Sequence, residues 1–218
     1  MKNELIDNIC RAVEAMDRDH ILALVKRAVK LNDNPHTIVH QGLCNGLEIL
    51  GQKCETGEVF FPHLVEMTRT IETAMNLLKP FLPHFGRLTS GTVILGVVEG
   101  DIHDLGKNII KMILTSSGFR VMDLGKNVPP SQFVEHAIRE KANIICMSAY
   151  LDTVIDGMGH VIERLRSTAP ENRIKVVVGG RPVSEAFANE IGAHGYAPNA
   201  AMALEVVRSL EANHQGAV

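Results

Sequence analysis

The apolar residues change their spacing partway along the chain. In the first third they recur every three or four positions, as on one face of a helix, beginning with Leu5, Ile9 and Val13. This spacing predicts four helices, over about 3–16, 18–31, 35–51 and 61–80. Asn34 followed by Pro35 is typical of a helix start, with a capping side chain before a first-turn proline. Because the connections are short, we expect a small antiparallel four-helix bundle.

Beyond about residue 90, short β-branched runs alternate with amphipathic segments. The predicted strands are Thr92–Val98, Arg120–Leu124, Asn143–Met147, Ile174–Val178 and a weaker one around Gly195–Ala197. The predicted helices are about 106–117, 131–140, 153–168, 183–190 and 199–211. This alternation indicates an α/β fold, a doubly wound parallel five-stranded sheet of the flavodoxin-like (Rossmann-like) kind. We therefore expect a helical cap domain over 1–88 and an α/β domain over 89–218.

Composition and charge narrow the range of partners. The chain is 45% hydrophobic and 22% charged, as is usual for a soluble globular protein. A net charge of −3 gives no broad attraction to phosphate backbones or anionic membranes, so neither nucleic acid nor a membrane is expected as a partner. There is no long apolar stretch and no signal-peptide pattern, which favours a cytoplasmic location. The four cysteines form no CxxC pair and are expected to be reduced and structural.

The residues that carry chemistry follow the predicted strands. Ligands of parallel α/β sheets bind outside the carboxyl ends of the strands, so we expect these residues to share one edge. They are Asp101, Ile102, His103, Asp104, Leu105 and Gly106 after the first strand, Ser148, Tyr150, Leu151 and Thr153 after the third, Gly179 and Gly180 after the fourth, and Ala197 at the fifth. Taken singly, His103 could be a core or capping histidine, Asp101 a helix cap and the glycine pair a turn.

Together these residues resemble a known cobalamin-binding pattern, DxHxxG followed by SxL and GG. The matching residues, in order and spacing, are Asp101, His103, Gly106, Ser148, Gly179 and Gly180. The segments Glu58–Pro62 and Val128–Pro130 resemble the same family. Nearly the whole chain is thus similar to the corrinoid proteins of anaerobic methyltransferase systems that act on methylamines, methanol or methoxyaromatic compounds.

The resemblance implies a cobalamin bound with its lower base displaced. His103 would then ligate cobalt, Asp101 would hold the other ring nitrogen, and Ser148 would bond the buried base. Gly179 and Gly180 would leave room for the nucleotide tail, so a side chain at Gly180 is expected to block the tail and leave the fold intact. The other cofactor-binding residues implied are Ile102, Asp104, Leu105, Gly106, Tyr150, Leu151, Thr153 and Ala197.

The implied function is to carry a methyl group on cobalt and not to act as a complete enzyme alone. A substrate-specific methyltransferase would deliver the group, an acceptor methyltransferase would pass it to tetrahydrofolate or coenzyme M, and a reductive activase would restore the cofactor. The donor stays open among methanol, methylamines, betaines and aromatic methyl ethers. The alternatives are a cobalamin-binding regulatory or mutase-type module, or a nucleotide-binding protein. A nucleotide-binding protein should carry the glycine-rich phosphate loop GxGxxG after the first strand. This chain has GDIHDLG there, which does not match.

Two positions depart from the family. Tyr150 stands where the motif has leucine, and its ring either borders the base pocket or turns away from it. Val154 stands where the methionine-forming member has a serine that completes a His-Asp-Ser relay, so Asp101 is expected to bond to water or to Thr153 instead.

The helical part has a candidate role as a cover for the cofactor. Leu64, Met67 and either Phe60 or Phe61 are candidates for an apolar surface over the upper face of cobalt, or alternatively they fill the bundle core. The connection 83–90 is a candidate hinge between the domains.

Overall fold

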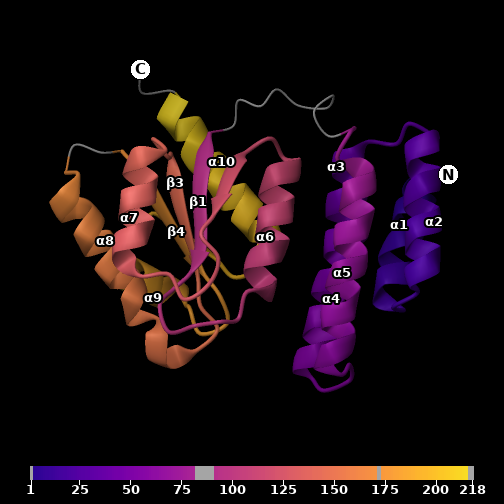
Figure 1. Ribbon diagram of the computed structural model, residues 1–218, viewed down its shortest axis with the longest axis horizontal. Helices are drawn as coiled ribbons and strands as arrows, with labels where there is room; N and C mark the ends of the chain where they lie inside the picture. Colours follow the sequence, from indigo (N-terminus) through magenta and orange to yellow (C-terminus); the bar gives the residue numbers. More distant parts are fainter. Residues whose placement is uncertain (1, 82–90, 171–172, 216–218) are drawn as a thin grey trace. The chain divides into compact units, whose positions relative to one another are not determined.

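The computed structural model describes residues 2–81, 91–170 and 173–215. The chain divides into two compact units, Met1–Arg87 and Leu88–Val218, which are described separately (Figure 1). The candidate hinge at 83–90 lies outside the described residues. Within the described ranges, none of the helices has the length and apolar character that a membrane span needs.

The first unit is a bundle of helices, as predicted. Its elements are α1 (Lys2–Glu14), α2 (Arg18–Lys30), α3 (Pro35–Thr37), a π-helical segment (Ile38–Cys44), α4 (Asn45–Glu55) and α5 (Phe61–Leu78). Helix α1 contacts α2, the π-helical segment and α4, while α5 contacts α2 and α4. Asn34 caps α3 as expected, since its side chain accepts a hydrogen bond from the His36 N–H at 2.9 Å.

The predicted helix 35–51 differs from the observed one. The helical path runs on to Glu55 and includes the π-helical segment, which a search for a regular 3.6-residue period does not detect. Two glycines in this path lie against α1. A Cβ atom on Gly42 would stand 2.9 Å from Ile9 Cγ2, and one on Gly46 would stand 2.8 Å from the Cys10 carbonyl oxygen. The two helices can therefore approach this closely only because these positions lack side chains.

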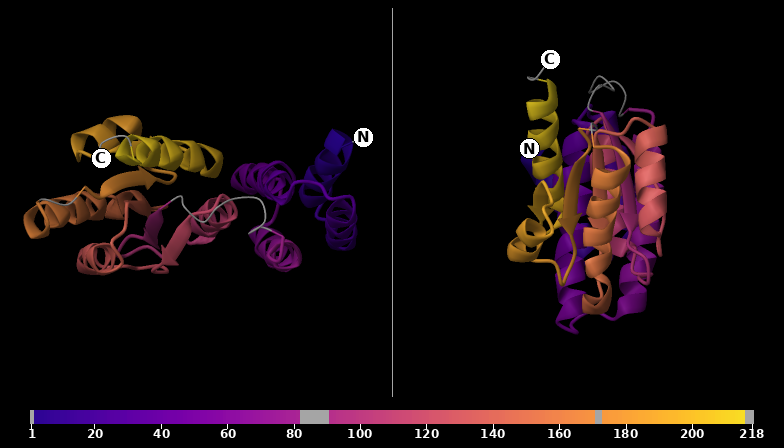
Figure 2. Two further views of the ribbon diagram at one scale, coloured as in Figure 1. Left: turned by 90° about the horizontal axis from the view of Figure 1, so that it is seen from above. Right: turned by 90° about the vertical axis from the view of Figure 1, so that its left-hand side faces the viewer.

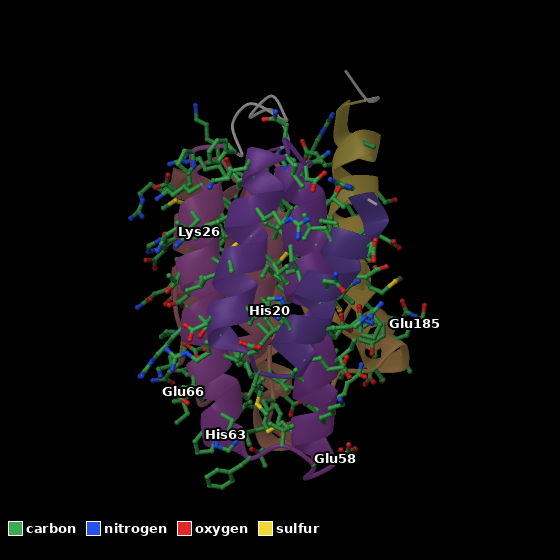
Figure 3. The ribbon with its side chains drawn as sticks, turned by 90° about the vertical axis from the view of Figure 1, so that its right-hand side faces the viewer. His20, Lys26, Glu58, His63, Glu66 and Glu185 are labelled. Atoms are coloured by element: carbon green, nitrogen blue, oxygen red, sulfur yellow. The ribbon has the colours of Figure 1, made fainter. Side chains whose placement is uncertain are left out.

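The candidates for an apolar cover over the cofactor differ in how deeply they are buried. Leu64 and Met67 are buried, as residues that fill a core would be. Phe60 is exposed and makes an edge contact with the ring of His63, with 5.9 Å between ring centroids. Figure 3 shows His63 and Glu58 near the same end of this unit. The side chain of Phe61 lies outside the described part of the structure.

The second unit is the predicted parallel sheet. Its strands are β1 (Thr92–Val97), β2 (Arg120–Asp123), β3 (Ile144–Ser148), β4 (Lys175–Gly179) and β5 (Gly195–Ala197). They pair in parallel in the order β2-β1-β3-β4-β5, the flavodoxin-like order. Strands β3 and β4 are buried almost throughout, as central strands of a sheet covered on both faces should be.

Helices cover both faces of the sheet. They are α6 (Leu105–Ser116), α7 (Pro130–Arg139), α8 (Asp156–Thr168), α9 (Glu185–Glu190) and α10 (Ala200–Gln215), with a short 3₁₀ turn at Asp152–Val154. Figure 1 shows α7 and α8 on one side of the strands and α6 on the other, and Figure 2 shows α10 on the side away from α7. Helix α6 packs against α10, and α7 against α8. The predicted element boundaries in this unit are correct to within a few residues.

Candidate functional site

The register of the sheet places four strand ends in one row. Val97 of β1 lies beside Ser148 of β3, Ser148 lies beside Gly179 of β4, and Gly179 lies beside Ala197 of β5. The loops that follow these strands therefore open at one edge, as the sequence analysis predicts. Ser148 is half-buried, and within the described residues its hydroxyl makes no hydrogen bond.

Asp101 is the centre of the hydrogen bonding at this edge. Its side chain is 0% exposed. Oδ1 accepts hydrogen bonds from the His103 backbone N–H at 2.9 Å and from the His103 ring Nδ1 at 2.7 Å. Oδ2 accepts from the backbone N–H groups of Tyr150 at 2.6 Å and Leu151 at 3.1 Å. One carboxylate thus joins the loop after β1 to the loop after β3.

These bonds keep Asp101 ionised. Burial alone would raise the pKa of its carboxyl, but the hydrogen bonds from Tyr150, His103 and Leu151 outweigh burial and hold the pKa below its ordinary value. Because an ionised carboxylate has no proton to donate, His103 Nδ1 must carry the proton of this bond. With the proton on Nδ1, the nitrogen that can offer a lone pair to a metal is Nε2, and the side chain is 42% exposed. An imidazole held in this way has the tautomer of a metal ligand.

Among the described residues, the donors to the Asp101 carboxylate are N–H groups and include no hydroxyl of the relay type. Backbone N–H groups occupy the oxygen that faces the β3 loop, and Thr153 is not among its hydrogen-bond donors in the described structure. Val154 instead packs near Gly100, where an added Cβ atom would stand 2.9 Å from Val154 Cγ1. Of the two expected partners of Asp101, water and Thr153, the second is therefore not its donor in the described part of the chain.

Asn127 also holds the β1 loop, and the sequence analysis missed it. Its side-chain Oδ1 accepts a hydrogen bond from the Gly100 N–H at 2.7 Å, and its own N–H donates to the Asp101 carbonyl at 2.9 Å. Both Gly100 and Asn127 have positive φ angles, of 86° and 55°. The sequence signal for this contact was a glycine in the loop after β1 and an asparagine in the loop after β2, because these residue types tolerate the left-handed region best.

A buried ion pair fixes the start of α6 beside the site. Lys107 Nζ donates to both carboxylate oxygens of Asp123, each at 2.8 Å, and to Asn108 Oδ1 at 2.7 Å. Asp123 also accepts from Lys111 and from the Gly125 N–H. Burial alone would raise the pKa of Asp123, but these hydrogen bonds, led by that from Lys107, lower it. Sequence reasoning missed this pair because a helical lysine is normally exposed.

The two glycines after β4 lie against protein backbone. A Cβ atom on Gly179 would overlap the carbonyl oxygen of Ala197, and one on Gly180 would overlap the carbonyl oxygen of Ala149. Gly180 also has a φ angle of +121°. The expectation that a side chain at Gly180 leaves the fold intact is therefore wrong. By contrast, a Cβ atom on Gly106 would meet no atom within 4 Å.

The remaining predicted residues surround His103 unevenly. Ile102, Tyr150 and Leu151 are exposed apolar or aromatic side chains at this edge. The Tyr150 ring lies on the imidazole of His103, with 4.6 Å between centroids. The edge thus presents one imidazole within an apolar border, beside open space at Gly106.

Stability should depend on the ionised state of Asp123. A carboxyl whose pKa is lowered in the folded protein contributes stability that is present above its unfolded pKa and lost as pH falls through the folded value. We expect the free energy of unfolding, measured with urea, to fall as pH drops below about 4, where free aspartate titrates. Asp123→Asn should make this fall shallower, and the exposed control Asp156→Asn should not. An unchanged slope in Asp123→Asn would contradict the assignment.

The fold and the edge residues together define a cobalamin-binding protein. A parallel sheet presents an Asp-x-His loop with a ligand-type imidazole, then a serine, then two glycines packed against backbone, in the order of the motif. Comparison with known proteins agrees. The family described as B12 binding domain matches residues 91–205, and a second family with the same description matches residues 5–79.

Individual relatives cover nearly the whole chain. Dimethylamine corrinoid protein 2 of Methanosarcina acetivorans is 36% identical over 96% of this chain and 97% of its own length. The solved monomethylamine corrinoid protein of Methanosarcina barkeri is 31% identical, with a TM-score of 0.75 over 96% of this chain and 100% of that one. The methanol:cobalamin methyltransferase complex of the same organism contains a chain that is 25% identical. Its TM-score is 0.60, over 97% of this chain and 81% of that one. The chain belongs to the corrinoid proteins of methyltransferase systems, and its cofactor is cobalamin.

Proposed function

We propose that this chain carries a methyl group between two methyltransferases, with His103 as the lower ligand of the cobalt. The observation that carries the proposal is the imidazole whose Nδ1 is held by a fully buried, ionised carboxylate at the ligand-binding edge of a parallel sheet. Bound cobalamin supplies a cobalt that accepts and gives up the methyl group. The protein supplies orientation, a fixed tautomer and a border that excludes water.

Each edge residue has a distinct task in this proposal. Asp101 orients the His103 ring and fixes its tautomer, as an acceptor behind a ligand histidine does. The hydroxyl of Ser148, which bonds to none of the described residues, would be available to the displaced base. Gly106 leaves space at the start of α6, and Ile102 and Leu151 offer apolar contacts around the ring. These residues therefore fit the cofactor.

The partners are proposed from the relatives. One relative is part of a methanol:cobalamin methyltransferase complex, which supports a substrate-specific methyltransferase as the donor-side partner. An acceptor methyltransferase that uses tetrahydrofolate or coenzyme M, and a reductive activase, complete the proposed cycle. Because the relatives include dimethylamine and monomethylamine corrinoid proteins, a methylamine is the first donor to test.

The axial ligand can be tested by electron paramagnetic resonance of the bound cofactor in its Co(II) form. We expect hyperfine splitting from one protein nitrogen, and the splitting should change when the histidines carry nitrogen-15. His103→Ala should abolish it, because it removes the imidazole that Asp101 holds at this edge. His160→Ala, which removes an exposed histidine of α8 in the same unit, is the control and should retain it. Splitting that persists in His103→Ala would show that another group ligates the cobalt.

A further inference from the structure

Tyr150 contacts both members of the His-Asp pair. Its backbone N–H donates to Asp101 Oδ2 at 2.6 Å, and its ring lies on the His103 imidazole with 4.6 Å between centroids and 33° between planes. The two contacts come from one residue of the β3 loop, while Asp101 and His103 belong to the β1 loop. Any displacement of Tyr150 would therefore disturb the carboxylate and the imidazole together.

Arg181, from the loop after β4, holds the tyrosine ring. Its guanidinium carbon lies 5.4 Å from the centre of the Tyr150 ring, and one of its terminal nitrogens donates to the Tyr150 hydroxyl at 3.2 Å. A cation over an aromatic face is attracted by the ring quadrupole, and the hydrogen bond adds a fixed direction. His103, Tyr150 and Arg181 therefore form a stack that joins the loops after β1, β3 and β4.

The stack restrains a rotation of the His103 imidazole that its hydrogen bond to Asp101 does not prevent. A single bond from Nδ1 fixes one point of the imidazole, but the ring can still turn about the line from Nδ1 to Oδ1. Turning would swing Nε2, the atom with the lone pair. A flat ring packed against the imidazole restrains its plane, because offset aromatic pairs have a preferred geometry. A leucine in the same place would contact the imidazole without defining its plane.

We propose that Tyr150 and Arg181 are positioning residues that set the plane of the His103 imidazole and so aim Nε2 at the cobalt. The inference rests on the proposed function, because it concerns His103 as the lower ligand. Neither residue touches the metal in this proposal. Tyr150 acts through His103, and Arg181 acts through Tyr150.

The first readout needs no cofactor. In the empty protein, the Tyr150 ring current should displace the nuclear magnetic resonance signals of the His103 ring protons. Tyr150→Leu, which introduces the leucine of the cobalamin motif, should remove this displacement, while Tyr150→Phe should retain it because the ring remains. Ile138→Ala, near the C-terminal end of α7, is the control. It is matched in exposure, because Ile138 and Tyr150 are both 38% exposed.

The second readout is the loaded protein. Tyr150→Leu should broaden or reduce the nitrogen splitting of the Co(II) form and weaken cobalamin affinity about threefold to tenfold, the range of one aromatic pair. Tyr150→Phe should restore most of both. Arg181→Ala should give an intermediate change. Arg173→Ala is the control and should change neither the splitting nor the affinity. It removes an exposed arginine that precedes β4, whereas Arg181 follows that strand.

The outcomes separate this inference from the proposed function. Wild-type protein without a histidine nitrogen on cobalt would overturn the part of the proposed function that makes His103 the ligand, and the inference with it. Wild-type protein with that nitrogen, and a Tyr150→Leu variant with the same ring-proton signals, splitting and affinity, would overturn the inference alone. If circular dichroism shows that Tyr150→Leu does not fold, the comparison of Arg181→Ala with Arg173→Ala tests the inference instead. Identical spectra and identical cobalamin affinities in these two variants would reject it.

Discussion

Gly180→Val should strongly lower the free energy of unfolding of the sheet unit. A Cβ atom at Gly180 would overlap the Ala149 carbonyl oxygen, which is backbone and cannot rotate away. The φ angle of +121° adds strain for a β-branched residue. Overpacking and backbone strain of about 1–3 kcal/mol each together remove roughly 4 kcal/mol, which is a large part of the usual stability of a domain. Urea unfolding followed by circular dichroism measures the change.

Gly106→Ala is the matched control and should behave in the opposite way. Its Cβ atom would meet nothing within 4 Å, and the residue is the second of helix α6. Alanine favours a helix over glycine by up to about 1 kcal/mol, so the empty protein should be as stable as wild type or slightly more stable. Cobalamin affinity should nevertheless fall, because the open space is the space proposed for the ring. A Gly180→Val protein of wild-type stability would show that the β3 and β4 loops can separate freely.

The two glycine sites show what the motif could and could not predict. The sequence indicates where side chains are absent, and the parallel topology then gathers Gly106, Ser148 and Gly179 at one edge. It does not indicate what occupies the space beside each glycine. At Gly180 that space is filled by protein backbone, whereas at Gly106 it is open. Only the three-dimensional register distinguishes a glycine that the fold needs from one that a ligand needs.

The helices and strands were predictable because their apolar periods are regular. The π-helical segment at Ile38–Cys44 was not, since a single wide turn shifts the period without a sequence marker. Asn127 and Arg181 were missed for another reason. Both act through contacts with residues far away in the sequence, Asn127 with Gly100 and Asp101, and Arg181 with Tyr150. Local patterns can indicate a residue that suits a turn, but they do not identify its long-range partner.

Lys107→Met should lower the free energy of unfolding by about 3 kcal/mol, the lower end of the loss when one partner of a buried ion pair is removed. The Lys107 side chain is 2% exposed, and its ammonium group satisfies both oxygens of Asp123. Methionine fills a similar volume, so the loss reports the uncompensated carboxylate more than a cavity. The loss stays near the lower end because Lys111 still contacts Asp123 at 3.0 Å.

Lys111→Met provides a control on the same helix, against the same carboxylate and with the same replacement. The Lys111 side chain is 47% exposed, and exposed ion pairs contribute only about 0–1 kcal/mol. Urea unfolding should therefore give a loss at least threefold smaller than in Lys107→Met. In the double variant Lys107→Met, Asp123→Leu, much of the stability should return, because no buried charge is left without its partner. Equal losses for the two lysines, or no recovery in the double variant, would mean that the carbon stem of Lys107 stabilises α6 and its charge does not.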